Sequence, residues 1–365
     1  MKVLYIGNYR DGTGWGNAAI NNILALDTAG IEVVPRAISF QEKCTDYPER
    51  IKLLEQNNEL GCDVCIQHTL PHLYCASSHI KNIGFIECET DNFKDSNWQN
   101  YANTMDEIWV ASMSARVSCR ASKIKTPIKI APHSLDISQY KPIQDGPKIQ
   151  ELQKTFNFVF VGEFVERKNI EILIRAFHTE FDVDEPVNLF IKTSLQDLSY
   201  VQEYCAKIKN GLKLRQKYKE EIIISGHLKK SEYISVLSQC HSFVMPSRGE
   251  AFCIPALEAM AIGIPVIYTE NTGMSDFCVG TEVKSRYVSC FGAMSTIPSL
   301  YTANNKWLEV DVDDLRIAMR NAYMMSNSKE GEQQKKEAID KAKMYSHQNI
   351  GQQLKELLND SQCDD

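Results

Sequence analysis

The amino-acid sequence predicts an α/β protein made of two doubly wound domains, each built on a parallel sheet. The chain has 365 residues, of which 43% are hydrophobic, so it can bury two hydrophobic cores. Short apolar runs typical of buried strands alternate along the chain with longer stretches of helical periodicity. Such alternation favours parallel sheets with helices on both faces.

Composition restricts the class of protein. The net charge of −7, with 24% charged residues, gives no indication of a general polyanion binder. No apolar run approaches the ~20 residues that a membrane-spanning helix requires. The opening residues 1–7 read as a strand rather than a secretory signal, and the 12 cysteines then fit a reducing compartment. We therefore expect a cytoplasmic protein with free thiols.

The first half of the chain contains the predicted strands of the first sheet. We expect strands at residues 2–7, 31–37, 62–67, 82–87 and 107–112, with helices at 17–29 and after Ser112. A glycine-rich turn with Gly14 and Gly16 follows the first strand in the pattern G-x-G-x-G. This pattern differs from the dinucleotide fingerprint, and no acidic residue ends the next strand, which disfavours a dehydrogenase.

Polar residues at the ends of predicted strands are candidates for ligand binding. In open α/β sheets ligands lie beyond the carboxyl ends of the strands, where the sequence places His68, Glu87 and Glu89. His68 also belongs to a Cys/His cluster, Cys62 to Cys75, that is compatible with zinc by residue type. Because Cys62 and Cys65 would point to opposite faces of a strand, they could not share one ion, and we predict no zinc site.

A basic stripe is predicted on the helix after Ser112. Arg116, Arg120 and Lys123 are three and four positions apart and therefore share one face of that helix. The stripe is either an ordinary solvated face or a contact for an acidic acceptor or membrane surface, in which case the protein is peripheral to a membrane.

The second half of the chain repeats the alternation of strands and helices. We expect strands at residues 158–162, 187–192, 221–225, 242–246 and 264–268, and helices at 170–181, 199–218, 231–239, 311–325, 330–344 and 348–359. Prolines and a polar run predict domains at 1–140 and 156–345 with a linker at 141–155. Residues 280–310 show no regular spacing of hydrophobic residues from which a helix or strand could be predicted.

Two acidic pairs, Asp182/Asp184 and Asp311/Asp313, have the D-x-D spacing of a metal-binding motif. That chemistry requires the pair directly after a buried strand. The first pair follows a predicted helix, and the second occupies a predicted N-cap, so we reject both as metal sites.

The stretch from Met245 to Glu270 carries the strongest functional pattern. Glu250 and Glu258 are eight positions apart, in a predicted order of strand, loop, short helix and strand. Pro255 suits the first turn of the helix and Gly263 the position after its end. The amides of the loop residues Phe252, Cys253 and Ile254 then form the kind of helix start that binds anions.

The frame PS…E.F..P..EAM..G.PVI resembles the donor-site signature of retaining glycosyltransferases of the GT-B fold. This resemblance implies two Rossmann-like domains facing across a cleft, with the final helix, 346–360, returning to the first. It implies that Glu258 holds the ribose hydroxyls of a nucleotide-sugar donor and that Glu250 lies against the transferred sugar. It further implies that Phe252, Cys253 and Ile254 hold the diphosphate, that His68 faces the sugar, and that Gly14 and Gly16 approach the donor.

The loop after the first strand of the second domain departs from this family. Relatives carry an Arg directly after the glycine and a Lys five positions later, and both hold the diphosphate. Here Lys168 matches the Lys, but Glu163 occupies the place of the Arg. Arg167 could replace the missing cation, or it could pair with Glu163 or Glu166 at the surface.

The resemblance implies sugar transfer from a nucleotide-diphospho-sugar to an acceptor hydroxyl, with retention of configuration. With no credible D-x-D pair, we expect no metal and no cofactor, because Lys168, Arg167 and helix-start amides would compensate the charge of the diphosphate. The alternatives are a sugar-nucleotide epimerase, a phosphorylase, for which the chain is short, or a non-catalytic sugar-nucleotide or glycan binder. The base, the sugar and the acceptor (glycan, lipid-linked glycan, protein or modified nucleic acid) are not specified by the sequence.

Overall fold

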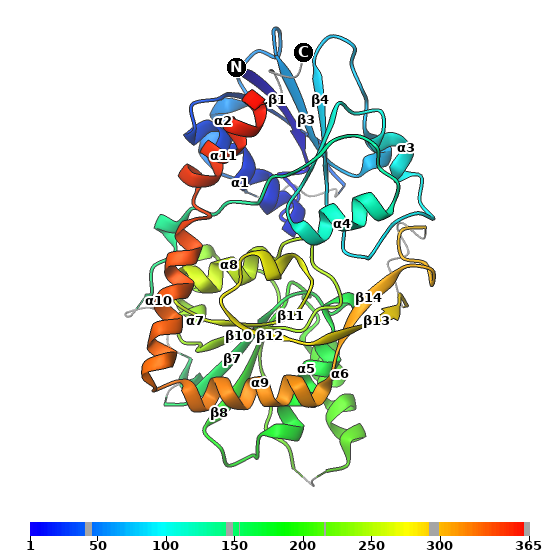
Figure 1. The fold of residues 1–365 in the computed structure, drawn as a ribbon. Coiled ribbons are helices and arrows are strands. Elements are labelled where there is room, and N and C mark those ends of the chain that lie inside the picture. Colours follow the sequence, from blue (N-terminus) through cyan, green and yellow to red (C-terminus); the bar gives the residue numbers. More distant parts are fainter. Residues whose placement is uncertain (41–45, 144–148, 153, 215–216, 292–298, 361–365) are drawn as a thin grey trace. The chain divides into compact units, whose positions relative to one another are not determined.

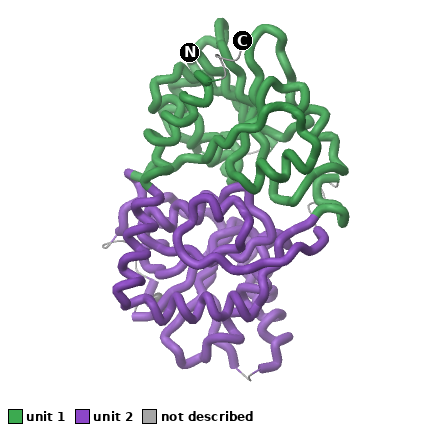
Figure 2. Tube along the Cα trace, in the orientation of Figure 1, with its two compact units in different colours: residues 1–137, 294–305, 343–365 green, residues 138–293, 306–342 purple. Residues whose placement is uncertain are grey.

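The structure, a computed structural model, consists of two compact units, each assembled from separate parts of the chain (Figure 2). It describes all residues except 41–45, 144–148, 153, 215–216, 292–298 and 361–365. Unit 1 comprises Met1–Ile137, Met294–Asn305 and Lys343–Asp365, and unit 2 comprises Ser138–Ala293 and Lys306–Ala342. The predicted linker, 141–155, lies partly outside the described residues.

Unit 1 is built on a parallel sheet of six strands, in the order β2-β1-β3-β4-β5-β6 (Figure 1). The strands are β1 (Lys2–Gly7), β2 (Glu32–Ala37), β3 (Val64–His68), β4 (Lys81–Ile86), β5 (Glu107–Val110) and β6 (Ile128–Ile130). Their apolar side chains, among them Val3, Ile66, Phe85 and Trp109, are almost fully buried. The order reverses between β1 and β3, which makes their carboxyl ends the switch point of this sheet.

The helices of unit 1 are α1 (Gly14–Thr28), α2 (Glu49–Leu54), α3 (Trp98–Ala102), α4 (Met113–Ala121) and α11 (His347–Asp360). The last of these lies beside the first: α11 packs on α1 (Figure 1). The two backbones approach closely at Gly351, where an added Cβ atom would lie 2.1 Å from the carbonyl oxygen of Ala25. Only glycine fits this position without a shift of the helices.

Unit 2 contains a second parallel sheet of six strands, in the order β12-β11-β10-β7-β8-β9. The strands are β7 (Phe156–Val161), β8 (Val187–Lys192), β9 (Ile222–Ile224), β10 (Ser242–Met245), β11 (Val266–Thr269) and β12 (Gly280–Val283). The order reverses between β7 and β10, which are hydrogen-bonded neighbours. Two doubly wound parallel sheets confirm the predicted α/β fold class.

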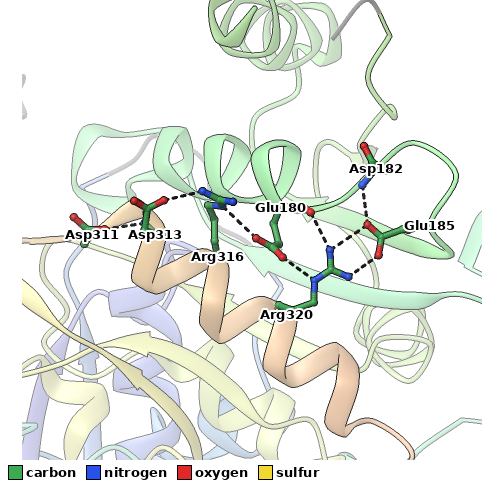
Figure 3. A network of polar contacts seen from close by, with 7 residues as sticks. All are labelled: Glu180, Asp182, Glu185, Asp311, Asp313, Arg316 and Arg320. Atoms are coloured by element: carbon green, nitrogen blue, oxygen red, sulfur yellow. Dashed lines mark hydrogen bonds and ion pairs between the residues drawn. The ribbon is translucent and has the colours of Figure 1, made fainter. Parts of the chain in front are cut away.

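The helices of unit 2 are α5 (Ile170–Glu180), α6 (Leu198–Leu212), α7 (Lys230–Leu237), α8 (Ile254–Ala261), α9 (Val312–Met325) and α10 (Lys329–Lys343, whose last residue belongs to unit 1). A network of ion pairs joins α9 to the end of α5 (Figure 3). Arg320 Nε lies 2.7 Å from Glu180 and its Nη1 lies 2.5 Å from Glu185, and Arg316 also contacts Glu180 at 3.2 Å.

The structure adds α2, α3 and β6, which were not predicted, and other parts of the chain differ from the sequence-based expectation in their bounds or form. Helix α1 begins at Gly14 rather than at 17, because the hydroxyl of Thr13 caps its first turn. Helix α6 ends at Leu212 rather than at 218. The next residue, Lys213, has a left-handed conformation with φ of 53°, which ends the helix. Residues 280–310 form β12 and an antiparallel pair, β13 (Ser285–Ser289) and β14 (Lys306–Val310), with 292–298 outside the described residues.

The chain between β13 and β14 contributes its end to unit 1. There Tyr301 donates a hydrogen bond of 2.7 Å to Glu89, and Thr302 donates one of 2.5 Å to Asp95. The fully buried Asn305 bonds to the carbonyl oxygen of Asn92. Among the residues described, no helix is both long enough and apolar enough to cross a bilayer.

Candidate functional site

The candidate site of unit 2 lies where the carboxyl ends of β7 and β10 meet. In an open parallel sheet ligands bind at such a switch point, because the loops of the two strands turn away from each other there. The loop after β7 contains the 3₁₀ turn Glu166–Lys168, and the loop after β10 runs from 246 to 253. The amide of Arg248 donates a hydrogen bond of 2.7 Å to the carbonyl oxygen of Arg167, which ties the two loops together.

Glu250 is the centre of this site and is paired with two cations. Its Oε1 atom lies 2.6 Å from Nζ of Lys168 and 3.2 Å from Nη1 of Arg167. The residue is buried, with 6% of its surface exposed. Although burial alone would raise the pKa of Glu250, the charges of Lys168 and Arg167 lower it. The carboxylate is therefore ionised at neutral pH.

The structure brings Arg167 to the site and leaves Glu163 exposed. Besides its contact with Glu250, Arg167 donates a hydrogen bond of 2.7 Å to the carbonyl oxygen of Gly249. Glu166 faces a different cation, because its carboxylate lies 3.8 Å from Arg248. Arg167 thus contacts the first glutamate of the motif, a pairing that neither sequence-based alternative included.

Glu258 projects from α8 toward two tyrosines. The hydroxyl of Tyr140 donates a hydrogen bond of 2.5 Å to Oε1, and the hydroxyl of Tyr233 donates one of 2.9 Å to Oε2. Burial raises the pKa of Glu258, an effect that both hydroxyls and Lys230 oppose. Each oxygen of this carboxylate is held by one phenol.

The start of α8 lies between the two glutamates in the sequence. Its N-cap, Cys253, has a left-handed conformation with φ of 84°, and the ring of the preceding Phe252 stacks on Phe277 with centroids 4.5 Å apart. Pro255 occupies the first turn, as predicted. Phe252 and Cys253 precede the helix, and the amide of Ile254, in its first turn, has no acceptor within the helix and is a donor of the type that binds anions.

The other predicted site residues lie in unit 1. His68 is the last residue of β3 and is fully buried. Its Nδ1 atom contacts the hydroxyl of Tyr5 at 2.8 Å, and its Nε2 atom lies 3.3 Å from Oε1 of Glu87. The same oxygen lies 2.6 Å from Nε2 of His133. His68, Glu87 and His133 thus form a buried polar triad at the end of the sheet.

The triad has the ligand types and the spacing of a metal site, since its ligand atoms lie within 4.8 Å of one another. They also satisfy one another by hydrogen bonds. Burial lowers the pKa of His68, against the effect of Glu87. Although burial works in the opposite direction, the charge and hydrogen bond of His133 lower the pKa of Glu87 to about 2. Within the described residues no other Cys, His, Asp or Glu group has this spacing, the Cys62–Cys75 segment included.

The two glycines lie in the first turn of α1. Gly14 is exposed, and a Cβ atom added to it would meet nothing within 4 Å. Gly16 is buried, and its amide donates to Thr13, so this amide is engaged by the helix cap. An added Cβ atom at Gly16 would lie 3.0 Å from the carbonyl oxygen of Asn8.

The remaining predicted features have structural partners or exposed positions. Figure 3 shows Asp311 as the cap of α9, where it accepts from the amide of Asp313, and Asp313 paired with Arg316 at 2.8 Å. On α4, Arg120 is exposed, as is Lys123 just beyond the helix, while Arg116 is half-buried. The same helix exposes two apolar side chains, Met113 and Val117.

Sequence reasoning missed three residues that the structure adds to these sites. His133 follows β6, and Tyr140 follows the turn Ile137–Gln139, both shortly before the predicted linker 141–155. Tyr233 lies on α7. The predicted boundary marked the region of the first two residues, but no spacing in the sequence pointed to Tyr233.

Part of the chain is similar in sequence to known proteins. Residues 144–286 match the model of the family Glycosyl transferases group 1. An uncharacterized glycosyltransferase from Methanocaldococcus jannaschii is 32% identical over 125 residues, which cover 34% of this chain and 32% of that protein. Mannosylfructose-phosphate synthase from Agrobacterium fabrum is 24% identical over 155 residues, which cover 40% of this chain and 33% of that protein. The matched segments thus span about a third of these relatives.

Solved structures match nearly the whole chain. HepE from Anabaena, in complex with UDP and glucose, aligns with a TM-score of 0.66 at 14% identity, covering 99% of this chain and 100% of that one. OtsA aligns with a TM-score of 0.69 at 11% identity, and the alignment covers 98% of this chain and 99% of OtsA. Sucrose-phosphate synthase from Thermosynechococcus elongatus aligns with a TM-score of 0.67 at 14% identity, and the alignment covers 99% of this chain and 98% of the synthase. The predicted GT-B fold is thereby confirmed.

Proposed function

We propose that the protein transfers a sugar from a nucleotide-diphospho-sugar to an acceptor hydroxyl, with retention. This proposal is supported by the match of residues 144–286 to the model of the family Glycosyl transferases group 1 and by the GT-B fold of the chain. The observation that carries this proposal is the convergence of Lys168, Arg167 and Glu250 at the switch point between β7 and β10. HepE, a protein of the same fold, was solved with UDP and glucose.

The chemical requirement of this reaction is to stabilise a departing diphosphate. Lys168 and Arg167 have 16% and 15% of their side chains exposed, so their charges act in a largely desolvated setting. Together with the first amides of α8 they provide fixed donors for phosphate oxygens. Because these groups supply the charge compensation in place, the proposal requires neither a metal ion nor a cofactor.

The carboxylates have separate roles in this proposal. Oε1 of Glu250 faces the cations, which leaves Oε2 to contact sugar hydroxyls and to favour positive charge at the anomeric carbon. Glu258 would hold the ribose hydroxyls. His68, with both ring nitrogens engaged by Tyr5 and Glu87, would take part by shaping the end of the first sheet. The leaving phosphate oxygen would accept the proton of the incoming hydroxyl.

The direct test is a panel of sugar nucleotides incubated with the protein and analysed by mass spectrometry, with and without glycan, lipid-linked and protein acceptors. Transfer, or slow donor hydrolysis, is the expected result, and the anomeric configuration of the product by NMR tests retention. A changed sugar with donor alone would indicate an epimerase. Saturable binding without turnover on every acceptor would indicate a non-catalytic binder.

Two variants assign the roles of the glutamates. Glu258→Ala should chiefly raise the KM for the donor, because it removes hydrogen bonds to a charged acceptor worth about 1.5–3 kcal/mol each. Glu250→Ala should chiefly lower kcat, because its contact strengthens as the sugar becomes cationic. The reverse pattern would refute the assignment.

We further propose that α4 provides contact with an acidic acceptor or membrane surface. Arg120 and Lys123 are exposed near Met113 and Val117, which combines positive charge with apolar side chains. Co-sedimentation should occur with vesicles containing phosphatidylglycerol and be lost in the Arg120→Glu/Lys123→Glu variant. Equal sedimentation of both proteins would show that the face is merely solvated.

A further inference from the structure

We propose that Tyr140 and Tyr233 are positioning residues for the nucleotide, which fix the two oxygens of Glu258 so that this carboxylate accepts the vicinal hydroxyls of a ribose. This inference rests on the proposed function, because it takes the ligand to be a nucleoside diphosphate. It assigns roles to two residues that lie outside the glutamate motif and come from different parts of the chain.

The hydrogen-bond geometry gives each oxygen one phenol. Tyr140 donates to Oε1 and Tyr233 donates to Oε2, at 2.5 and 2.9 Å. A carboxylate can accept about four hydrogen bonds, so each oxygen retains capacity for one more donor. Within the described part of the chain, Glu258 has no other hydrogen-bond partner. Two remaining acceptor positions on two separated oxygens match the two hydroxyls of a vicinal diol.

The two phenols are themselves held in place. Tyr140 is buried, and Nζ of Lys230 lies 4.8 Å from the centre of its ring. Tyr233 and Lys230 both belong to α7, while Glu258 is in the middle of α8. Glu258 is therefore oriented before any ligand arrives, and the entropy of fixing its side chain is not lost again on binding.

The phenols also favour the ionised form of Glu258. The titratable groups that face it are Tyr140, Tyr233 and Lys230, and all three oppose the effect of burial, which raises the pKa of the carboxyl group. A protonated carboxyl would offer one acceptor fewer to the ribose. Removing a phenol should therefore shift the loss of nucleotide binding on acidification to a higher pH.

The opposite interpretation is that the phenols occupy the places of the ribose hydroxyls and must leave before a nucleotide binds. The two interpretations predict opposite changes in nucleotide affinity when a tyrosine is replaced by phenylalanine. If the tyrosines position Glu258, Tyr→Phe weakens binding. If they block it, Tyr→Phe strengthens binding.

The experiment is calorimetric titration of the full chain with UDP, GDP and ADP, followed by the 2′-deoxy and 3′-deoxy forms of whichever nucleotide binds. For Tyr140→Phe and Tyr233→Phe we expect Kd to rise about five- to tenfold with the ribonucleotide, the effect of one hydrogen bond to a charged group. With the deoxy forms the rise should be smaller than twofold. Tyr200→Phe, whose side chain is exposed on α6, is the matched control and should bind as the wild type does.

Tighter binding by either variant, an unchanged Kd, or an equal loss with ribo and deoxy forms would each overturn the positioning role. Titrations from pH 5 to 8 add an independent readout. On acidification, both variants should lose nucleotide binding at a higher pH than the wild type does. If none of the three diphosphates bound the wild type, the proposed function itself would fail. Binding to the wild type with no change in the variants would refute only this inference.

Discussion

Nζ of Lys168 lies 2.6 Å from Oε1 of Glu250, and this ion pair links the turn after β7 to the loop after β10. Arg167 contacts the same oxygen at 3.2 Å. The carboxylate is therefore a counter-ion of both cations. In the proposed reaction an entering diphosphate would have to compete with Glu250 for these cations, so the glutamate would oppose nucleotide binding while supporting sugar transfer.

The first prediction follows from this competition. Glu250→Gln should tighten the binding of a nucleoside diphosphate about fivefold, because it removes a charge worth roughly 1 kcal/mol of competition, while kcat falls. Calorimetry with UDP, GDP and ADP measures the first effect. Glu171→Gln, on the exposed part of α5, should leave the affinity unchanged. Weaker nucleotide binding in Glu250→Gln would contradict the competition.

The second prediction concerns the two cations. Arg167→Ala and Lys168→Ala should each lower kcat/KM at least tenfold, about 1.4 kcal/mol of transition-state stabilisation. Arg175→Ala, which removes an exposed arginine with a loose contact of 3.6 Å to Glu171, is the control. Because Arg167 also bonds to Gly249, thermal unfolding should be measured in parallel. Wild-type efficiency in Arg167→Ala would show that Lys168 alone suffices.

The third prediction is that donor turnover proceeds in excess EDTA. Lys168, Arg167 and the amides at the start of α8 would supply the charge compensation that a metal ion supplies elsewhere. Initial rates with and without EDTA, followed by readdition of magnesium or manganese, are the measurement. Activity lost to EDTA and restored by either ion would show that the diphosphate needs a metal.

The fourth prediction concerns acid stability. The pKa of His68 is lowered in the folded protein from its ordinary 6.5, so the unfolded state binds more protons below that pH, and stability falls as the pH drops through it. Glu87, with a pKa of about 2 instead of 4.5, adds a second loss as the pH falls below 4.5. Urea unfolding between pH 8 and 2 measures both losses of stability. His68→Asn should reduce the loss of stability around pH 6.5. The same substitution at the exposed His79 should leave that loss unchanged.

Much of the fold could be predicted because its strands are short apolar runs between polar turns. Strands β1 and β8 and helix α5 lie within a residue or so of their expected positions. The hairpin strand β13, Ser285–Ser289, was not predicted because it is largely exposed and therefore lacks the apolar alternation of a buried strand.

The glutamate motif was visible in the sequence because its members lie within one helix and the loop before it. Tyr140 is 118 positions from Glu258, and only the folded chain brings them together. The pairing of Arg167 with Glu250 likewise joins residues 83 positions apart. A single sequence specifies local periodicity well but contains no direct record of such distant contacts.

The pairing of α11 with α1 also determines the order in which the protein can be completed during synthesis. Every residue of unit 2 precedes 343, whereas unit 1 includes the final helix. A chain released before residue 347 would contain all of unit 2, but its α1 would leave exposed to solvent the surface that α11 covers, including the backbone at Ala25. Such a chain would therefore carry a complete unit 2 joined to an open, aggregation-prone unit 1.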